Sequence, residues 1–271
     1  MIYRLIHKNG TTIDFDIEMI AAAIEVALEA ESHDDGFTQD EREKYHRYIQ
    51  IMAELDWPAY INGDTDFHKR IIASYEAGGI SAVESSIYDY YGALYLKGLE
   101  DELASSDVIK QERLPLFREA LLLYQLGYYY GAVAILTTQL IGIAADIESF
   151  LKRNHTSYNP KTLELIKKRY RLVNTNDTSR VMTAVVEGMI LDDDQNEYSF
   201  LLGYLRSKIF HNHISKAETE RHVNRNMLCH GSQLNYGTKE HALKVILCIE
   251  ALAWVAEVIS DNLNINSADV E

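Results

Sequence analysis

The chain has 271 residues, of which 47% are hydrophobic and 25% are charged, so it can bury the core of one large domain or two smaller ones. Its net charge of −15 argues against indiscriminate binding to nucleic acid, because phosphate contacts need Lys and Arg. Three prolines favour long helices over a loop-rich β fold, and two cysteines argue against a disulfide framework and fit a reducing cytoplasm.

Residues 1–108 are expected to form a mostly helical region that opens with a short β-hairpin. Apolar residues lie on both sides of Asn9-Gly10, the pair best suited to a two-residue type I′ turn, which predicts the hairpin over residues 1–16. Gly78-Gly79 is expected to break the helical pattern that follows, and the polar stretch 104–107 to end this region. Apolar spacings of three and four predict helices over 17–30, 40–55, 66–76 and 81–103.

Residues 109–271 are expected to form a helical bundle, so the predicted fold class is all-α. Residues 113–150 are predicted as one long helix or two, because Gly127 and Gly131 allow a small break. Further helices are predicted over 162–170, 177–191, 198–210, 218–230 and 238–260, followed by a frayed tail over 262–271. Thr238 is expected to cap the last helix, whose inward-facing residues would be Leu243, Ile246, Ile249, Ala253 and Ala256.

One uncharged stretch, from Ala120 to Ala145, is long enough to span a bilayer. It also contains Gln125 and Gln139, together with threonines, tyrosines and glycines. Because those polar groups are costly to transfer into lipid, we interpret the stretch as a central helix of a soluble bundle and expect no membrane association.

Charge is distributed unevenly along the chain. Between Gly203 and Lys244 the net charge is +4, so the remainder carries −19, and five of the ten histidines fall in the same segment. Charge alone favours a solvated surface there. A basic, histidine-rich patch on an acidic protein can nevertheless hold one anion while the rest of the surface repels polyanions.

Residues 224–231 contain the side chains of this sequence that are best suited to catalysis. On a helix, Asn226 and His230 share a face, and the long side chain of Arg225 can reach the same edge. Gly231 suits the left-handed residue that ends a helix, and the helix dipole favours the protonated form of His230 at that end. A cation, an amide and an imidazole are a minimal set for metal-free phosphodiester cleavage. The reaction needs both an acid and a base, but one motif offers only one histidine. We therefore expect a two-fold dimer that brings two motifs together across one cleft.

Residues 225–230 resemble the R-x4-6-H motif of HEPN domains, including the polar residue after the arginine. Residues 127–132, Gly-Tyr-Tyr-Tyr-Gly-Ala, resemble the G-x-Y-x-x-A start of an early core helix in such domains. The resemblance covers roughly residues 112–262 of this chain. Two positions depart from the family pattern: Ser232 stands where one toxin subgroup has tyrosine, and Ile141 stands where an acidic residue is expected.

The resemblance implies an all-α bundle that dimerises and cleaves RNA without a metal or cofactor, leaving a 2′,3′-cyclic phosphate. It implies that Arg225 stabilises the phosphate, that Asn226 orients the substrate or His230, and that His230 is the acid–base group. Arg221, His222 and Lys239 are the predicted RNA-binding residues. Many HEPN domains are defence or stress toxins, so we expect a cytoplasmic homodimer with RNA as partner and an antitoxin or regulatory protein as a further one.

Two other functions remain open at this point. A non-catalytic HEPN-like interaction or dimerisation module would have the same fold, although the intact Arg225, Asn226 and His230 argue against it. A metal protein would use the histidines of the basic segment, but their spacing gives neither a Glu-x-x-His pair nor a His-x3-His pair on a helix. These histidines are His211, His213, His222 and His230. Cys229, beside His230, is expected to be a buried structural thiol.

Overall fold

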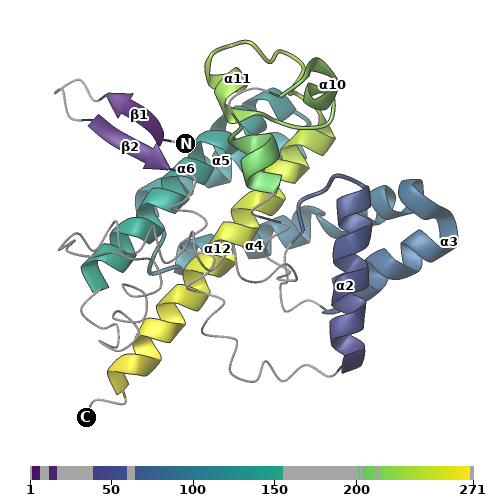
Figure 1. Ribbon diagram of the computed structural model, residues 1–271, viewed down its shortest axis with the longest axis horizontal. Coiled ribbons are helices and arrows are strands. Elements are labelled where there is room, and N and C mark those ends of the chain that lie inside the picture. Colours follow the sequence, from purple (N-terminus) through teal and green to yellow (C-terminus); the bar gives the residue numbers. More distant parts are fainter. Residues whose placement is uncertain are drawn as a thin grey trace, which may run out of the picture.

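The computed structural model describes residues 2–6, 12–16, 39–59, 65–154, 201, 204–211 and 214–268. Its secondary structure is mostly helical, which agrees with the predicted all-α class. Figure 1 shows the long helix α12 (Lys239–Ala268) running diagonally through the molecule, with other helices packed beside it. Strands β1 (Ile2–Ile6) and β2 (Thr12–Asp16) lie antiparallel, but the Asn9-Gly10 turn is outside the described residues and the hairpin stays a prediction.

The N-terminal part contains α2 (Gln39–Glu54), α3 (Thr65–Tyr90) and α4 (Ala93–Ser105). Gly79 interrupts α3 with a φ of 64° and a ψ of −152°, at the glycine pair that was predicted to break the helix. The prediction of one helix over 81–103 is wrong, because the helical pattern also stops at Gly92, whose backbone is extended. Glycine has a low helix propensity, so this second break has a local cause.

Residues 113–150 form two helices rather than one. A short 3₁₀ turn, η1 (Gln111–Arg113), leads into α5 (Leu114–Gln125), and α6 (Tyr129–Asn154) follows. Gly127 stands between them with a φ of 81°. Its amide donates to the Tyr124 carbonyl at 3.1 Å, and the Tyr128 amide donates to the Leu123 carbonyl at 2.8 Å. This pair of bonds is a Schellman motif, which satisfies the last carbonyls of α5 and ends the helix.

The hydrophobic core is continuous from α2 to α12, with α6 packed on both α5 and α12. Trp57 and Phe67 belong to the same core as Phe117 and Leu252. Tyr91, at the end of α3, donates from its hydroxyl to the Glu250 carboxylate of α12 at 2.8 Å. The core therefore crosses the predicted boundary between residues 108 and 109, and the division into 1–108 and 109–271 stays a prediction.

Helix α12 agrees with the sequence at its start and along its buried face. Thr238 accepts a hydrogen bond from the His241 amide at 3.1 Å, which confirms the predicted cap. The five residues predicted to face inward are all buried. The helix continues to Ala268, so the prediction of a frayed tail is wrong up to that residue.

Three predicted helices, over 17–30, 162–170 and 177–191, lie outside the described residues. Within the described part, one segment of 19 residues, Tyr129–Ile147 in α6, is long and apolar enough to cross a membrane by length and composition. A little over half of it is buried inside the protein, and the core helix of a soluble bundle passes the same test.

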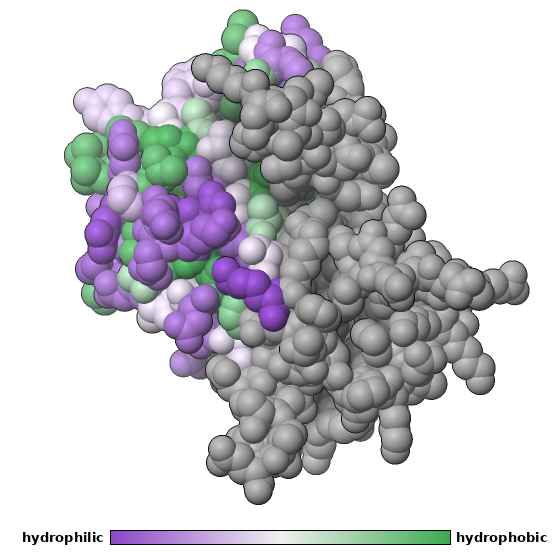
Figure 2. Space-filling model, turned by 90° about the vertical axis from the view of Figure 1, so that its left-hand side faces the viewer, coloured by the Kyte–Doolittle hydropathy of each residue, from purple (hydrophilic) through white to green (hydrophobic). Residues whose placement is uncertain are grey.

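Some large apolar side chains remain exposed, and Figure 2 shows hydrophobic residues in patches between hydrophilic ones on one face of the molecule. Several of them lie close together in sequence around the α5–α6 turn, and another follows α11 (Arg225–Cys229). They are Leu122, Leu126, Tyr128, Tyr130 and Leu234.

Candidate active site

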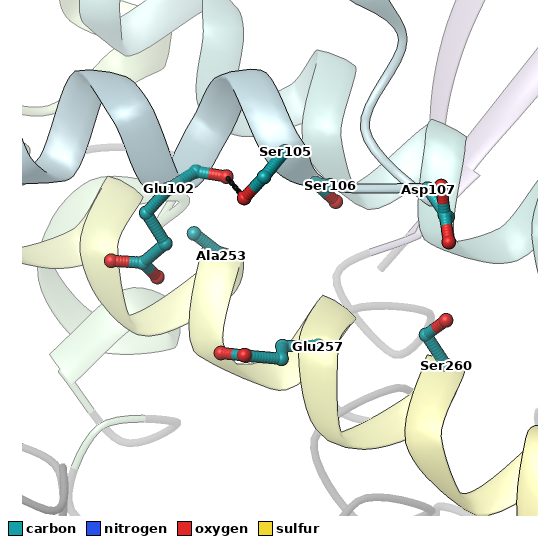
Figure 3. Close-up of a pocket in the computed structure, with 7 residues that line it drawn as sticks. All are labelled: Glu102, Ser105, Ser106, Asp107, Ala253, Glu257 and Ser260. Atoms are coloured by element: carbon teal, nitrogen blue, oxygen red, sulfur yellow. Dashed lines mark hydrogen bonds between the residues drawn. The ribbon is translucent and has the colours of Figure 1, made fainter.

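A pocket of about 160 Å³ between α4 and α12 offers acids and hydroxyls (Figure 3). Burial raises the pKa of Glu102 to about 7, and the nearby Glu250 and Glu257 carboxylates add to this effect. Among the described residues, no group of three or more His, Cys, Asp or Glu side chains is placed to hold a metal ion. The pocket is lined by Glu102, Ser105, Ser106, Asp107, Ala253, Glu257 and Ser260.

The predicted motif lies on a helix of its own, and the prediction of one helix over 218–230 is wrong. Helix α10 (Lys216–Thr219) begins with a capping box, in which Ser215 and Glu218 satisfy each other's amides, and ends after one turn. The chain is extended again at Asn224, with a φ of −111° and a ψ of 118°, before α11 begins. Asn224 accepts a hydrogen bond from the Met227 amide at 3.0 Å, so its side chain starts a new helix.

The Asn224 side chain is fully buried and fixes α11 to the π-helix η3 (Leu205–Ile209). Its Nδ2 donates to the carbonyl oxygens of Lys208 and His211, at 2.9 and 2.8 Å. These bonds set the position of the whole motif against the bundle. The residue type and its place before α11 are typical of an N-cap, so this role could have been predicted.

A second buried carboxamide, Gln233, closes the same loop from the other side. Its Oε1 accepts from the Asn224 amide at 2.9 Å. Its Nε2 donates to the carbonyl oxygens of His222 and Thr219, at 2.8 and 3.2 Å. Sequence reasoning missed this residue, because nothing in the pattern around Gln233 shows which carbonyls it meets.

The structure brings two of the three predicted catalytic side chains into contact. Arg225 Nη1 donates to Asn226 Oδ1 at 3.0 Å, and Asn226 Nδ2 donates to the His211 carbonyl at 3.3 Å. The backbone amide of His230 donates to the Asn226 carbonyl at 3.0 Å, which holds His230 one turn further along. Its ring is exposed and makes no hydrogen bond to any described residue. Arg225 Nε is buried and also has no partner among the described residues.

A glycine turn ends α11 directly after His230. Gly231 has a φ of 70°, which confirms the predicted left-handed residue. Its amide donates to the Leu228 carbonyl at 3.0 Å, and the Ser232 amide donates to the Met227 carbonyl at 2.8 Å. The expectation of a buried thiol at Cys229 is wrong, since this short helix leaves Cys229 exposed.

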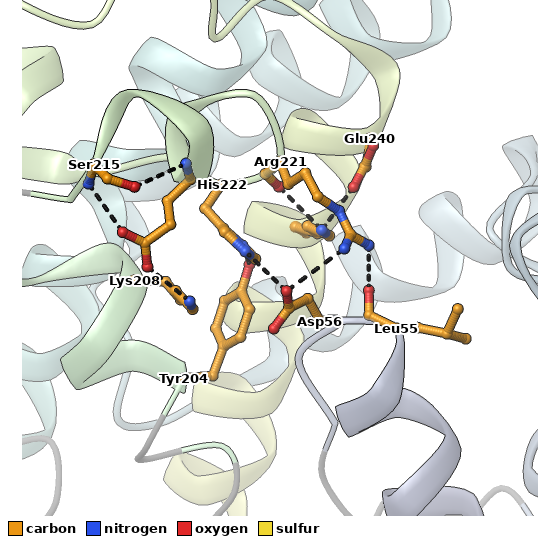
Figure 4. A network of polar contacts seen from close by, with 10 residues as sticks. Leu55, Asp56, Tyr204, Lys208, Ser215, Arg221, His222 and Glu240 are labelled. Carbon is orange, nitrogen blue, oxygen red and sulfur yellow. Dashed lines mark hydrogen bonds and ion pairs between the residues drawn. The ribbon is translucent and has the colours of Figure 1, made fainter. Parts of the chain in front are cut away.

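Two of the three predicted RNA-binding residues lie at the surface. Lys239 is exposed, with its Nζ 4.6 Å from the centre of the Tyr88 ring. Arg221 is partly engaged: one guanidinium nitrogen donates to the Leu55 carbonyl at 2.7 Å, and another lies 3.5 Å from Asp56 (Figure 4). The two cations therefore remain available to an anion, with Arg221 already held by the turn after α2.

The third predicted RNA-binding residue, His222, is only 1% exposed. Its Nδ1 lies 3.2 Å from the Tyr204 hydroxyl, and its Nε2 lies 3.6 Å from the Asp56 carboxylate. In this conformation the ring can position its neighbours but is not on the surface. Burial, together with the positive Lys244 and Lys208, lowers the pKa of His222 to about 4, although Asp56 acts in the opposite direction.

A buried cation completes this network at the start of α12. Lys244 Nζ donates to Glu240 at 2.6 Å and to the Arg221 carbonyl at 3.0 Å, and it lies 5.0 Å from the centre of the Trp57 ring. Burial lowers the pKa of Lys244, and Glu240 opposes that change. The network ties the N-terminal part of the chain to the segment that carries the motif (Figure 4).

The metal alternative has no support from the described geometry, in which His222 is bonded inside the protein and His213 is not described. Comparison with protein-family models, curated proteins and solved structures gave no match. A functional conclusion therefore depends on the chemistry of the site itself.

Proposed function

We propose that the protein is a metal-independent endoribonuclease of the HEPN type, with Arg225, Asn226 and His230 as its catalytic residues. One observation supports this most directly: the guanidinium of Arg225 is bonded to Asn226, one helical turn before the exposed imidazole of His230. A fixed cation and an accessible titratable group thus lie on one short helix whose backbone is held by buried amides.

The chemistry follows from these groups. A general base removes the proton from a ribose 2′-hydroxyl, whose oxygen forms a bond to the adjacent phosphorus. The bond from phosphorus to the 5′-oxygen breaks, a general acid protonates that oxygen, and the products carry a 2′,3′-cyclic phosphate and a 5′-hydroxyl. Arg225 stabilises the charge that develops on the phosphate oxygens. A two-fold homodimer supplies the second His230, so that one imidazole serves as base and the other as acid.

In this proposal Arg221 and Lys239 bind the RNA backbone beside the motif. Both carry positive charge on a chain whose other parts are acidic, which confines polyanion binding to this segment. The buried His222 contributes indirectly, because it lies against Asp56, the partner of Arg221. We further propose that the enzyme acts in the cytoplasm as a defence or stress toxin controlled by an antitoxin or regulatory protein.

The second candidate function is a non-catalytic HEPN-like interaction or dimerisation module. One observation favours it, namely the exposed apolar side chains in the loop after α11 and at the α5–α6 turn. Leu234 is 75% exposed and Leu126 is 59% exposed, and surfaces of this kind often contact other proteins. The two functions differ in what they require of His230, which an interaction module does not need as a proton-transfer group.

The deciding experiment is cleavage of mixed RNA by the purified protein in EDTA, beside His230→Ala. We expect cleavage by the parent, with 2′,3′-cyclic phosphate ends, and a loss of about 100-fold or more in the variant, the usual size of an acid–base contribution. Cys229→Ala is a matched control on the adjacent exposed residue and should cleave like the parent. Inhibition by EDTA would replace the proposal with a metal-dependent one, and no cleavage by folded protein would favour the interaction module.

A further inference from the structure

Two aromatic side chains around the start of α6 are exposed: Tyr128 directly precedes the helix, and Tyr130, in its first turn, meets the loop after α11. Tyr130 is 54% exposed and Tyr128 is 64% exposed. A surface tyrosine combines an apolar ring with a polar hydroxyl, and such residues are enriched where a protein meets a ligand or partner. Neither ring takes part in the proposed chemistry.

The Tyr130 ring is held in place although it is exposed. Its centroid lies 5.0 Å from that of Tyr236, with the two ring planes at 76°. It also lies directly against Gly237, where an added Cβ would come within 2.2 Å of two ring carbons. Only glycine leaves room for the ring at this position. The ring is therefore fixed before any ligand arrives, which lowers the entropy lost on binding.

The residues that fix this ring belong to the same loop as the motif. The loop leaves α11 at Gly231 and ends at Tyr236 and Gly237, and α11 itself contacts α6. Lys239, an exposed residue, follows two residues after Gly237, and its amine lies 4.6 Å from the centre of the Tyr88 ring. The Tyr130 ring, on α6, thus lies against a loop of the basic segment whose other end carries His230. A ring held against a loop of the basic segment suits a ligand that has both flat bases and phosphates.

Building on the proposed function, we propose that Tyr130 is a stacking platform for an unpaired base of the bound RNA. The bases of a duplex are stacked on one another, so only unpaired bases can lie on an aromatic side chain. The exposed Leu234 of the same loop would also suit a protein partner, but a protein gains nothing from the net positive charge of this segment unless the protein is acidic. Stacking on one tyrosine is worth about 1–3 kcal/mol per base, or roughly 5- to 150-fold in affinity.

The test measures binding in the His230→Ala background, so that cleavage does not obscure it. Full-length protein is titrated against a short labelled oligoadenylate and against an abasic ribose-phosphate oligomer of the same length. Tyr130→Leu should weaken oligoadenylate binding by roughly 5- to 150-fold and leave abasic binding unchanged. Tyr130→Phe keeps the ring and should bind like the parent. Since Tyr130 carries no charge, its replacement should leave the salt dependence unchanged, whereas Lys239→Ala should reduce the salt slope by about one.

Thermal unfolding of Tyr130→Leu shows whether the loop still folds. Equal oligoadenylate affinity in Tyr130→Leu and Tyr130→Phe would overturn the inference, as would an equal loss on the abasic oligomer or no RNA binding by the parent. A change only in self-association, measured by sedimentation, would assign the ring to a protein interface instead. Tyr130-dependent binding without cleavage by the unmodified protein would support the platform and remove the nuclease proposal, so the two can fail separately.

Discussion

The two ends of α11 differ in their burial and in their hydrogen bonds to the rest of the protein. Asn224, at its start, is fully buried, and its side chain makes three hydrogen bonds to backbone groups. His230, at its end, is exposed, and its ring makes no bond to the described residues. The difference indicates a division of labour, in which buried amides fix the backbone of the motif and the imidazole is left open to a ligand.

The largest effect should follow from Asn224→Ala. This change removes the N-cap of α11 and three hydrogen bonds, each worth about 1 kcal/mol or more. The Lys208 carbonyl and the Met227 amide lose their bonds to Asn224, and the His211 carbonyl keeps only its bond from Asn226. We expect the free energy of unfolding, measured in urea, to fall by about 3 kcal/mol. RNA cleavage should fall as well, because the motif loses its support.

His230→Ala is the matched variant at the exposed end of α11, and the opposite result is expected for it. Its ring contributes no bond within the described part, so the free energy of unfolding should change by less than about 0.5 kcal/mol while cleavage is lost. Asn224→Asp keeps the acceptor for the Met227 amide but loses both donated bonds, so it should resemble Asn224→Ala. Equal destabilisation by the changes at Asn224 and His230 would show that the two ends do not differ as we infer.

The sequence predicts the parts of this region whose signals are local. Gly231 was predicted as the left-handed residue, Thr238 as a cap, and five residues of α12 as its buried face, and the structure agrees with all three. Each depends on residue type and spacing within one element. The break before α11 was missed because apolar periodicity does not register the capping bond of Asn224.

Other features could not be predicted because their partners lie far away in sequence. His222 is predicted to bind RNA, but in the structure its ring is buried, with Tyr204 and Asp56 beside it. Gln233 is bonded to three backbone groups that only the folded loop brings together. In the N-terminal part the break at Gly79 followed from its glycine pair, whereas a lone glycine at position 92 gave too weak a signal.

The burial of His222 should make the free energy of unfolding depend on pH. The pKa of His222 is about 4 in the folded protein and 6.5 in the unfolded chain, so between these values only the unfolded chain binds the proton. Falling pH therefore destabilises the protein through this window, by up to about 3 kcal/mol from this one residue. Urea unfolding of the parent and of His222→Gln, from neutral pH to about pH 4, measures the difference. Identical pH profiles would mean that His222 is not buried as a neutral ring.

The smallest effect concerns the glycine turn directly after His230. Gly231→Ala places a Cβ at a φ of 70°, where nothing lies within 4 Å, so only backbone strain of about 1 kcal/mol should result. Gly79→Ala is a control for overall stability in α3, because a φ of 64° with a ψ of −152° is a conformation that only glycine adopts readily. Gly79→Ala should lose more unfolding free energy than Gly231→Ala, yet Gly231→Ala alone should slow RNA cleavage, by about 10-fold, because its strain displaces His230. Equal slowing by Gly79→Ala would mean that cleavage follows overall stability, so that the turn after His230 has no special part in it.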